Sequence, residues 1–321
     1  MRTPRIAPLL AALATAAALL APSALGAGPA TPHGARPSVA PSAYARAQIA
    51  PMVALLESLP HGRELSRLKL FVATDPELRA LCGARTMACY DPISERMTVS
   101  GEHAEIAGIP RESVIAHEYG HHIANNRVGG IWSAFAAGTP RWSTYERVCE
   151  HKRAGEAFPG NQGARYWSNP GEAFAQSYAE LVAPTAEWHY APLFQPDPTA
   201  LRKLREDVLD PLAPRHRSWR VGAPSRAGPA IESAQAVDAP FARTIGVAYD
   251  GRVRVRVRGL EGTRLSAALL DPADGSVLAS AGPSPDGVTR LRFASCGHRS
   301  LRLEVAPSGG AGSFEVDLVG P

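Results

Sequence analysis

The most regular alternation of hydrophobic and polar positions lies near the C-terminus. Arginine and valine alternate strictly from Arg252 to Arg258, and this period of two predicts a strand with one buried and one solvated face. Further short apolar runs lie at 265–270, 288–293, 301–305 and 314–319, separated by the turn pairs Asp274-Gly275, Asp286-Gly287 and Gly309-Gly310. Short strands at regular spacing are typical of a β-sandwich or jelly roll, which we expect over residues 241–321.

Helical spacing dominates the chain before this region. Apolar positions predict helices at 44–59, in the stretch that follows Pro110 through Ile123, and at 144–149, 170–181 and 199–209. Short strands are expected at 68–72 and around Met97 and Val99, and Asp75-Pro76 resembles a helix start with Asp at the cap. We therefore predict an α+β domain over residues 43–222.

The segments that flank these two domains have their own composition. Residues 1–26 contain the three parts of a secretory signal. These are the positive residues Arg2 and Arg5, an apolar run at 6–21, and the small-x-small site Ala24-Leu25-Gly26. The alternative is a retained membrane anchor, but the apolar run is shorter than the ~20 residues that a span needs. Pro, Gly, Ala and Ser are frequent at 27–42 and 223–240, which predicts a flexible leader and a linker. We expect a secreted, extracellular protein.

Charge limits the class of partner. The formal net charge is only +4, and no basic patch is interleaved with aromatic residues, so we expect no nucleic-acid partner. For the arginines of 252–258 two interpretations stay open: a solvated basic face, or a surface that contacts acidic polymers of a cell envelope. We expect the chain to be a monomer.

Four cysteines are present: Cys82, Cys89, Cys149 and Cys296. An even count in an exported protein suggests two disulfides, for which three connectivities exist. Cys82 and Cys89 are close in sequence and form the natural pair, which leaves Cys149 with Cys296. A zinc site of four thiolates and a pair of free, buried thiols remain the alternatives.

The candidate chemistry lies in the helix that follows Pro110. His117-Glu118-Tyr119-Gly120-His121 is an H-E-x-x-H motif, in which the two histidines lie one turn apart on one helix face. Both imidazoles can reach one zinc ion at about 2.0–2.1 Å, and Glu118 lies beside the metal as a general base for water. The alternative is a helix with two surface histidines.

A catalytic zinc site needs a third protein ligand. The extended motif H-E-x-x-H-x-x-G-x-x-H is excluded, because Ala124 and Arg127 occupy its last two positions. The segment 169–181 instead offers Glu172 in the first turn of a downstream helix, after Asn169-Pro170-Gly171 and before Ala173-Phe174-Ala175.

These two motifs resemble those of the gluzincin peptidases, and most closely a group of neutral zinc metallopeptidases exported by bacteria. The resemblance covers about residues 43–222 and implies a zincin-like fold, Zn²⁺ held by His117, His121 and Glu172, and a protein or peptide substrate. Jelly-roll accessory domains of secreted proteases resemble residues 241–321.

The sequence departs from the gluzincin pattern at one position. Thermolysin-like members carry an aspartate four residues after the ligand glutamate, where this chain has Gln176. Glutamine can accept a hydrogen bond from an imidazole but adds no charge, and Glu180 could act instead. The oxyanion donor is a further open choice, for which Tyr166 is favoured over the other candidates Tyr178, Tyr190 and His189.

The sequence therefore predicts a secreted zinc metallopeptidase in which Glu118 is the base and Tyr166 the oxyanion donor. The alternative is a non-catalytic secreted protein that binds through its β-sandwich and keeps an inactive zincin scaffold. The intact set of His117, Glu118, His121 and Glu172 favours the enzyme, because a binding module does not need the general base.

Overall fold

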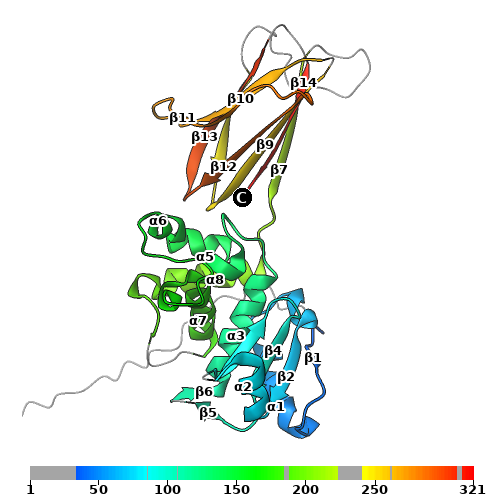
Figure 1. Ribbon diagram of the computed structural model, residues 1–321, viewed down its shortest axis with the longest axis vertical. Helices are drawn as coiled ribbons and strands as arrows, with labels where there is room; N and C mark the ends of the chain where they lie inside the picture. Colours follow the sequence, from blue (N-terminus) through cyan, green and yellow to red (C-terminus); the bar gives the residue numbers. More distant parts are fainter. Residues whose placement is uncertain are drawn as a thin grey trace, which may run out of the picture.

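A computed structural model describes residues 34–84, 86–106, 108–183, 188–222, 241–260, 262–308 and 313–321. These residues form an α+β region with a β-sandwich stacked on one end of it (Figure 1). The predicted signal peptide at 1–26 and the predicted linker at 223–240 lie outside the described residues. Within the described residues, no helix is long and apolar enough to cross a membrane.

The α+β region contains a four-stranded sheet in the order β1-β2-β4-β3. Its strands are β1 (Ser38–Val39), β2 (Lys69–Ala73), β4 (Arg96–Ser100) and β3 (Ala88–Asp91). The first three are mutually parallel, and β3 is an antiparallel edge strand. Strand β1 belongs to the expected flexible leader, yet it pairs with β2. A small hairpin of β5 (Glu105–Ile106) and β6 (Ile109–Pro110) lies just before the central helix.

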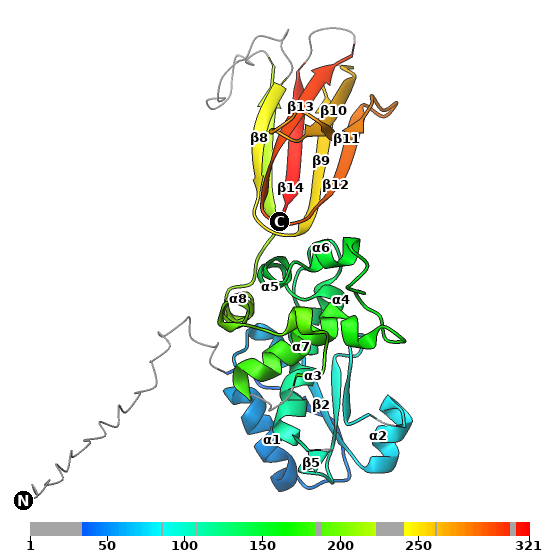
Figure 2. The same cartoon turned by 90° about the vertical axis from the view of Figure 1, so that its left-hand side faces the viewer.

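Helices make up the rest of this region (Figure 2). They are α1 (Arg46–Ser58), α2 (Asp75–Cys82), α3 (Arg111–Asn125), α4 (Ala134–Ala137), α5 (Pro140–Tyr145), α6 (Val148–Arg153), α7 (Pro170–Val182) and α8 (Pro198–Leu209). Helix α3 contacts β3, β4, α1 and α7, so it lies at the centre of the core. Its apolar positions predict this burial correctly: Ile115, Tyr119 and Ile123 are all fully buried.

Two local predictions in this region were wrong. The helix start at Asp75 is capped by Thr74, which forms a capping box with Glu77, and Asp75 is the first helical residue. The single helix expected at 144–149 is two helices, because Arg147 between them adopts the left-handed conformation with φ of 52°. The helices expected at 170–181 and 199–209 are present as Pro170–Val182 and Pro198–Leu209.

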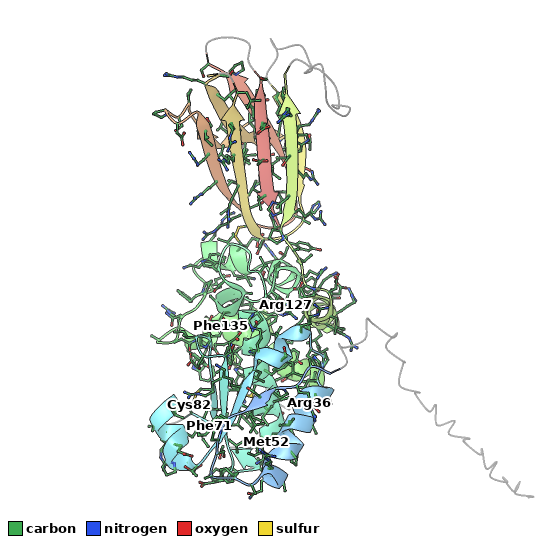
Figure 3. The ribbon with its side chains drawn as sticks, turned by 90° about the vertical axis from the view of Figure 1, so that its right-hand side faces the viewer. Arg36, Met52, Phe71, Cys82, Arg127 and Phe135 are labelled. Atoms are coloured by element: carbon green, nitrogen blue, oxygen red, sulfur yellow. A yellow bond between two sulfur atoms is a disulfide. The ribbon has the colours of Figure 1, made fainter. Side chains whose placement is uncertain are left out.

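Arg127, just after α3, forms a buried ion pair with Glu64 and a separate hydrogen bond to α8. Arg127 donates to a carboxylate oxygen of Glu64 at 3.0 Å and to the carbonyl oxygen of Val208 at 2.8 Å. Glu64 also accepts a hydrogen bond from the Tyr119 hydroxyl at 3.2 Å. Figure 3 places Arg127 in the half of the α+β region that faces the sandwich. Arg127 is therefore structural, in agreement with its exclusion as a metal ligand.

The C-terminal strands form two antiparallel sheets, in the orders β11-β10-β13-β8 and β12-β9-β14-β7. The strands are β7 (Arg215–Val221), β8 (Phe241–Val247), β9 (Gly251–Gly259), β10 (Leu265–Leu270), β11 (Val277–Ala281), β12 (Val288–Ser295), β13 (Arg299–Pro307) and β14 (Phe314–Gly320). Alternate residues of both sheets build one buried cluster, which includes Val255, Leu291, Leu303 and Val316. The prediction of sandwich-like strands is confirmed.

The sandwich begins earlier in the chain than expected. Strand β7 lies in the range predicted for the α+β domain, but it pairs with β14 along its whole length, with Trp219 opposite Val316. No hydrophobic alternation marks β7 as a strand in the sequence. Only Trp219 and Val221 pack against the sandwich core, and the rest of the strand is polar.

Both predicted disulfides are present. Cys82–Cys89 closes the connection between α2 and β3, and Cys149–Cys296 joins α6 to the sandwich. The second bridge is supported by a hydrogen bond from the Asp250 amide to the Thr144 hydroxyl at 2.8 Å. The sandwich is therefore linked to the α+β region by a covalent bond and by direct contacts. The alternatives of free thiols and a thiolate zinc site are wrong.

Candidate metal centre

The two histidines of the H-E-x-x-H motif lie side by side on α3. Their ring centroids are 4.9 Å apart, as the spacing of four residues requires. His121 is buried, while His117 is partly exposed. Both side chains point from α3 toward α7, whose first turn carries Glu172.

Glu172 is held in place by the start of α7. Asn169 caps this helix, with its side chain accepting a hydrogen bond from the Gly171 amide at 3.0 Å, and Pro170 occupies the first helical position. Gly171 packs so close to α4 that a Cβ there would lie 2.4 Å from the Phe135 carbonyl oxygen. The first turn of α7 therefore has little freedom, and Glu172 is directed at the histidines.

The three side chains converge on one point. Glu172 Oε2 lies 3.2 Å from His121 Nε2 and 3.5 Å from His117 Nε2, and all three potential ligand atoms lie within 4.8 Å of one another. Ligand atoms about 2.0–2.2 Å from a tetrahedral zinc ion lie roughly 3.3–3.6 Å apart. The residues present therefore fit a metal ion, and a set of two imidazoles and one carboxylate suits zinc chemistry.

Glu172 is ionised in this setting. Burial alone would raise the pKa of its carboxyl group, but His121 and His117 more than offset that effect and hold the pKa well below its usual range. The side-chain amide of Gln162 also contacts this carboxylate, because it donates a hydrogen bond to Glu172 Oε1 at 2.8 Å. Sequence reasoning missed Gln162, because a loop residue shows no periodicity that would indicate its target.

Gln176, the position at which the sequence departs from the gluzincin motif, contacts the ring of His117. Gln176 Oε1 lies 3.1 Å from His117 Nδ1, and the Gln176 amide nitrogen donates to Glu180 at 3.0 Å. Gln176 thus orients the ring, and Glu180 contacts that glutamine in turn. His121 differs, because its Nδ1 is buried without a hydrogen-bond partner among the described residues.

Of the four candidate oxyanion donors, two lie at the centre. The Tyr166 hydroxyl donates to Glu172 Oε2 at 2.9 Å, and burial raises its pKa so that it stays a donor. The Tyr190 ring stacks on His117, with centroids 6.1 Å apart. Tyr178 is turned away and donates to the Pro60 carbonyl oxygen at 2.6 Å, and His189 is exposed.

Glu118 is buried at 8% relative exposure, next to the ligand histidine. Burial raises the pKa of its carboxyl group to about 7; the His117 charge lowers this pKa, and Glu172 raises it. The backbone of Tyr90, on edge strand β3, provides a hydrogen bond that lowers it. A carboxyl group tuned toward neutral pH is characteristic of a proton-transfer group.

Comparisons with known proteins add no information about the site. No protein-family description matches the sequence, and no curated protein matches it. Among solved structures, the chain is similar to the SPBc2 prophage-derived protein YomS, with a TM-score of 0.23 and 14% identity, over 34% of this chain and 96% of that one. A similarity of this size carries no argument about fold or function.

Proposed function

We propose that the chain is a secreted zinc peptidase of the gluzincin type, with a zincin-like α+β domain. The observation that carries the proposal is the convergence of His117, His121 and Glu172 from two helices, at 3.2 and 3.5 Å between Glu172 and the two rings. These separations match the edge of a zinc tetrahedron. Glu118, buried beside them, has no role in a purely structural site.

Each side chain has a part in peptide hydrolysis. Zinc held by His117, His121 and Glu172 would supply a Lewis acid at this site. Glu118 takes a proton from the attacking water and delivers it to the leaving amine nitrogen. Tyr166, whose hydroxyl already lies against Glu172, donates a hydrogen bond to the developing oxyanion. Gln176 holds the His117 ring in register with the ligand set.

Export of the chain is part of the proposal. The secretory signal in the sequence and the two disulfides both fit an oxidising compartment. A protein or peptide is the proposed substrate, and a monomer the proposed active form.

Replacing the base tests the mechanism. Glu118→Gln should keep zinc and the fold but lower hydrolysis of casein or a fluorogenic peptide by about 10²-fold or more, because glutamine cannot accept the proton. Glu112→Gln is the matched control, since Glu112 is an exposed glutamate on the same helix. Wild-type activity in Glu118→Gln would refute the mechanism. A zinc-loaded wild type that cleaves no peptide would favour the non-catalytic binding protein.

A further inference from the structure

The outer face of the sheet β12-β9-β14-β7 carries a concentrated positive charge. Six exposed arginines of two adjacent strands form what we call the arginine stripe: Arg252, Arg254, Arg256 and Arg258 of β9, and Arg290 and Arg292 of β12. The alternate residues of β9, Val253, Val255 and Val257, face the sandwich core. Folding depends on those valines, whereas any polar residue would suit the outer positions.

The register sets arginines directly against arginines. Arg254 lies opposite Arg292, and Arg256 lies opposite Arg290. Like charges directly opposite on neighbouring strands destabilise a sheet. The stripe therefore costs the free protein some stability, and a bound anion would remove that cost.

Little within the protein neutralises the stripe. Arg290 forms an ion pair with Asp286 at 2.8 Å, and the other five arginines have no ion pair among the described residues. On the other side of β9, Asp317 of β14 lies opposite Arg256 and Glu315 lies opposite Arg258. Their ion pair and hydrogen bond go to β7 instead: Glu315 pairs with Arg220, and Asp317 accepts a hydrogen bond from Ser218 at 2.8 Å. The positive charge thus follows β9 and β12, bounded by acidic side chains on β14.

We propose that the arginine stripe binds a linear acidic polysaccharide that carries carboxylates along its length. Alternate residues of β9 lie about 6.6 Å apart and the two strands about 4.8 Å apart, so the stripe is roughly 20 Å long and narrow. Figure 2 shows β9, β12 and β14 running along the long axis of the sandwich. Guanidinium groups bind carboxylates through two parallel hydrogen bonds, which suits a row of single charges.

The charge pattern disfavours other polyanions. A planar anionic membrane would bring Asp317 and Glu315 against its own charge, and the exposed large apolar side chain of the described sandwich, Val277, lies on the other sheet. Single-stranded nucleic acid needs aromatic platforms for its bases. The aromatic residues of this sheet are all used by the core: Phe314 is buried in it, and Trp219 and Phe293 pack against it. A narrow chain can lie over β9 and β12 alone.

A polysaccharide bound to the arginine stripe would tether the whole protein to that polymer. The disulfide between Cys149 and Cys296 fixes the sandwich to the α+β region, so a polymer on the stripe would hold the metal centre at a constant place relative to it. The stripe lies outside the metal centre, and its binding does not depend on peptidase activity.

Binding of the full-length protein to polygalacturonate at low salt tests the proposal, with neutral dextran as the reference polymer. The wild type should bind polygalacturonate and release it in 1 M NaCl, because screening weakens exposed charge contacts. The stripe variant R252Q/R254Q/R256Q/R292Q should bind at least 10-fold more weakly. Its melting temperature should equal or exceed that of the wild type, since repulsion is relieved.

The control variant removes the same charge elsewhere. R46Q/R79Q/R202Q/R264Q changes four exposed arginines outside the stripe and should bind like the wild type. Cleavage of a small peptide should be the same in all three proteins, so failure of this proposal is distinct from failure of the proposed function. Undiminished binding by the stripe variant would overturn the proposal. So would binding to single-stranded DNA or phosphatidylglycerol vesicles in the absence of binding to polygalacturonate.

Discussion

Gln176 lies one hydrogen bond from His117, with 3.1 Å between the amide oxygen and Nδ1. The contact requires a proton on Nδ1, which leaves Nε2 free to coordinate a metal on the side of Glu172. A glutamine therefore sets the tautomer and the orientation of the ring where thermolysin-like gluzincins use an aspartate. It does so without adding negative charge to the site.

Gln176→Ala should weaken zinc binding by about 10–100-fold, because the His117 ring loses the partner that orients it. Titration of the metal-free protein against a competing chelator measures the effect. Gln195→Ala is the control, since Gln195 is exposed and far from the ligands in sequence. Equal zinc affinity in Gln176→Ala and the wild type would show that the contact does not support the metal.

Gly120 allows α3 to approach α7. A Cβ at this position would lie 2.8 Å from the Ala175 Cα and 3.0 Å from its carbonyl oxygen. In an exposed helix, alanine would stabilise the fold by about 1 kcal/mol relative to glycine. Here Gly120→Ala should instead destabilise the protein by about 1–3 kcal/mol, as overpacking does, and should lower zinc affinity by separating the two ligand helices.

Denaturant unfolding of Gly120→Ala decides between these opposite signs. The matched control is Gly246→Ala, because a Cβ at Gly246 meets no atom within 4 Å. A more stable Gly120→Ala protein would mean that the helices do not pack as closely as described.

Asp250 lies buried where the sandwich meets the α+β region. Burial, with the nearby charge of Glu150, raises the pKa of the Asp250 carboxyl group to about 6, although Arg153 and amides of Gly297 and Cys149 lower it. A carboxyl group with a raised pKa in the folded state binds its proton more tightly there than when unfolded. Its contribution to stability is therefore greatest below about pH 4 and declines as the pH rises to about 6.

Asp250→Asn should remove this decline, because asparagine stays neutral and can still accept from the Gly297 amide. The variant should be more stable than the wild type above pH 6, by on the order of 2–3 kcal/mol, and the difference should shrink between pH 6 and pH 4. Thermal unfolding across this range gives the difference directly. A difference that is constant with pH would contradict the raised pKa.

The sequence predicts the metal centre better than its surroundings. Spacing alone places His117 and His121 on one face, and Pro170 marks the helix that carries Glu172, because both signals are local. Gln162 reaches Glu172 from a loop, and Tyr190 reaches His117 from a segment beyond α7, so both depend on tertiary packing.

The same contrast holds for the fold. Strand β9 is evident from its alternation of arginine and valine, while β7 is mostly polar and forms only because β14 offers a partner. The helix break at Arg147 also has no local signal, since arginine is not a residue type that favours the left-handed conformation found there. Periodicity reports local burial, and it does not report pairing with distant segments.

Zinc content tests the central claim most directly. The protein, stripped of metal and then dialysed against zinc, should hold one zinc ion per chain by elemental analysis, and Glu172→Ala should lose it while staying folded. Glu112→Ala, at an exposed position of α3 outside the ligand set, should keep the ion. A wild type that holds no zinc, or a Glu172→Ala variant that holds as much as the wild type, would contradict the proposed metal centre.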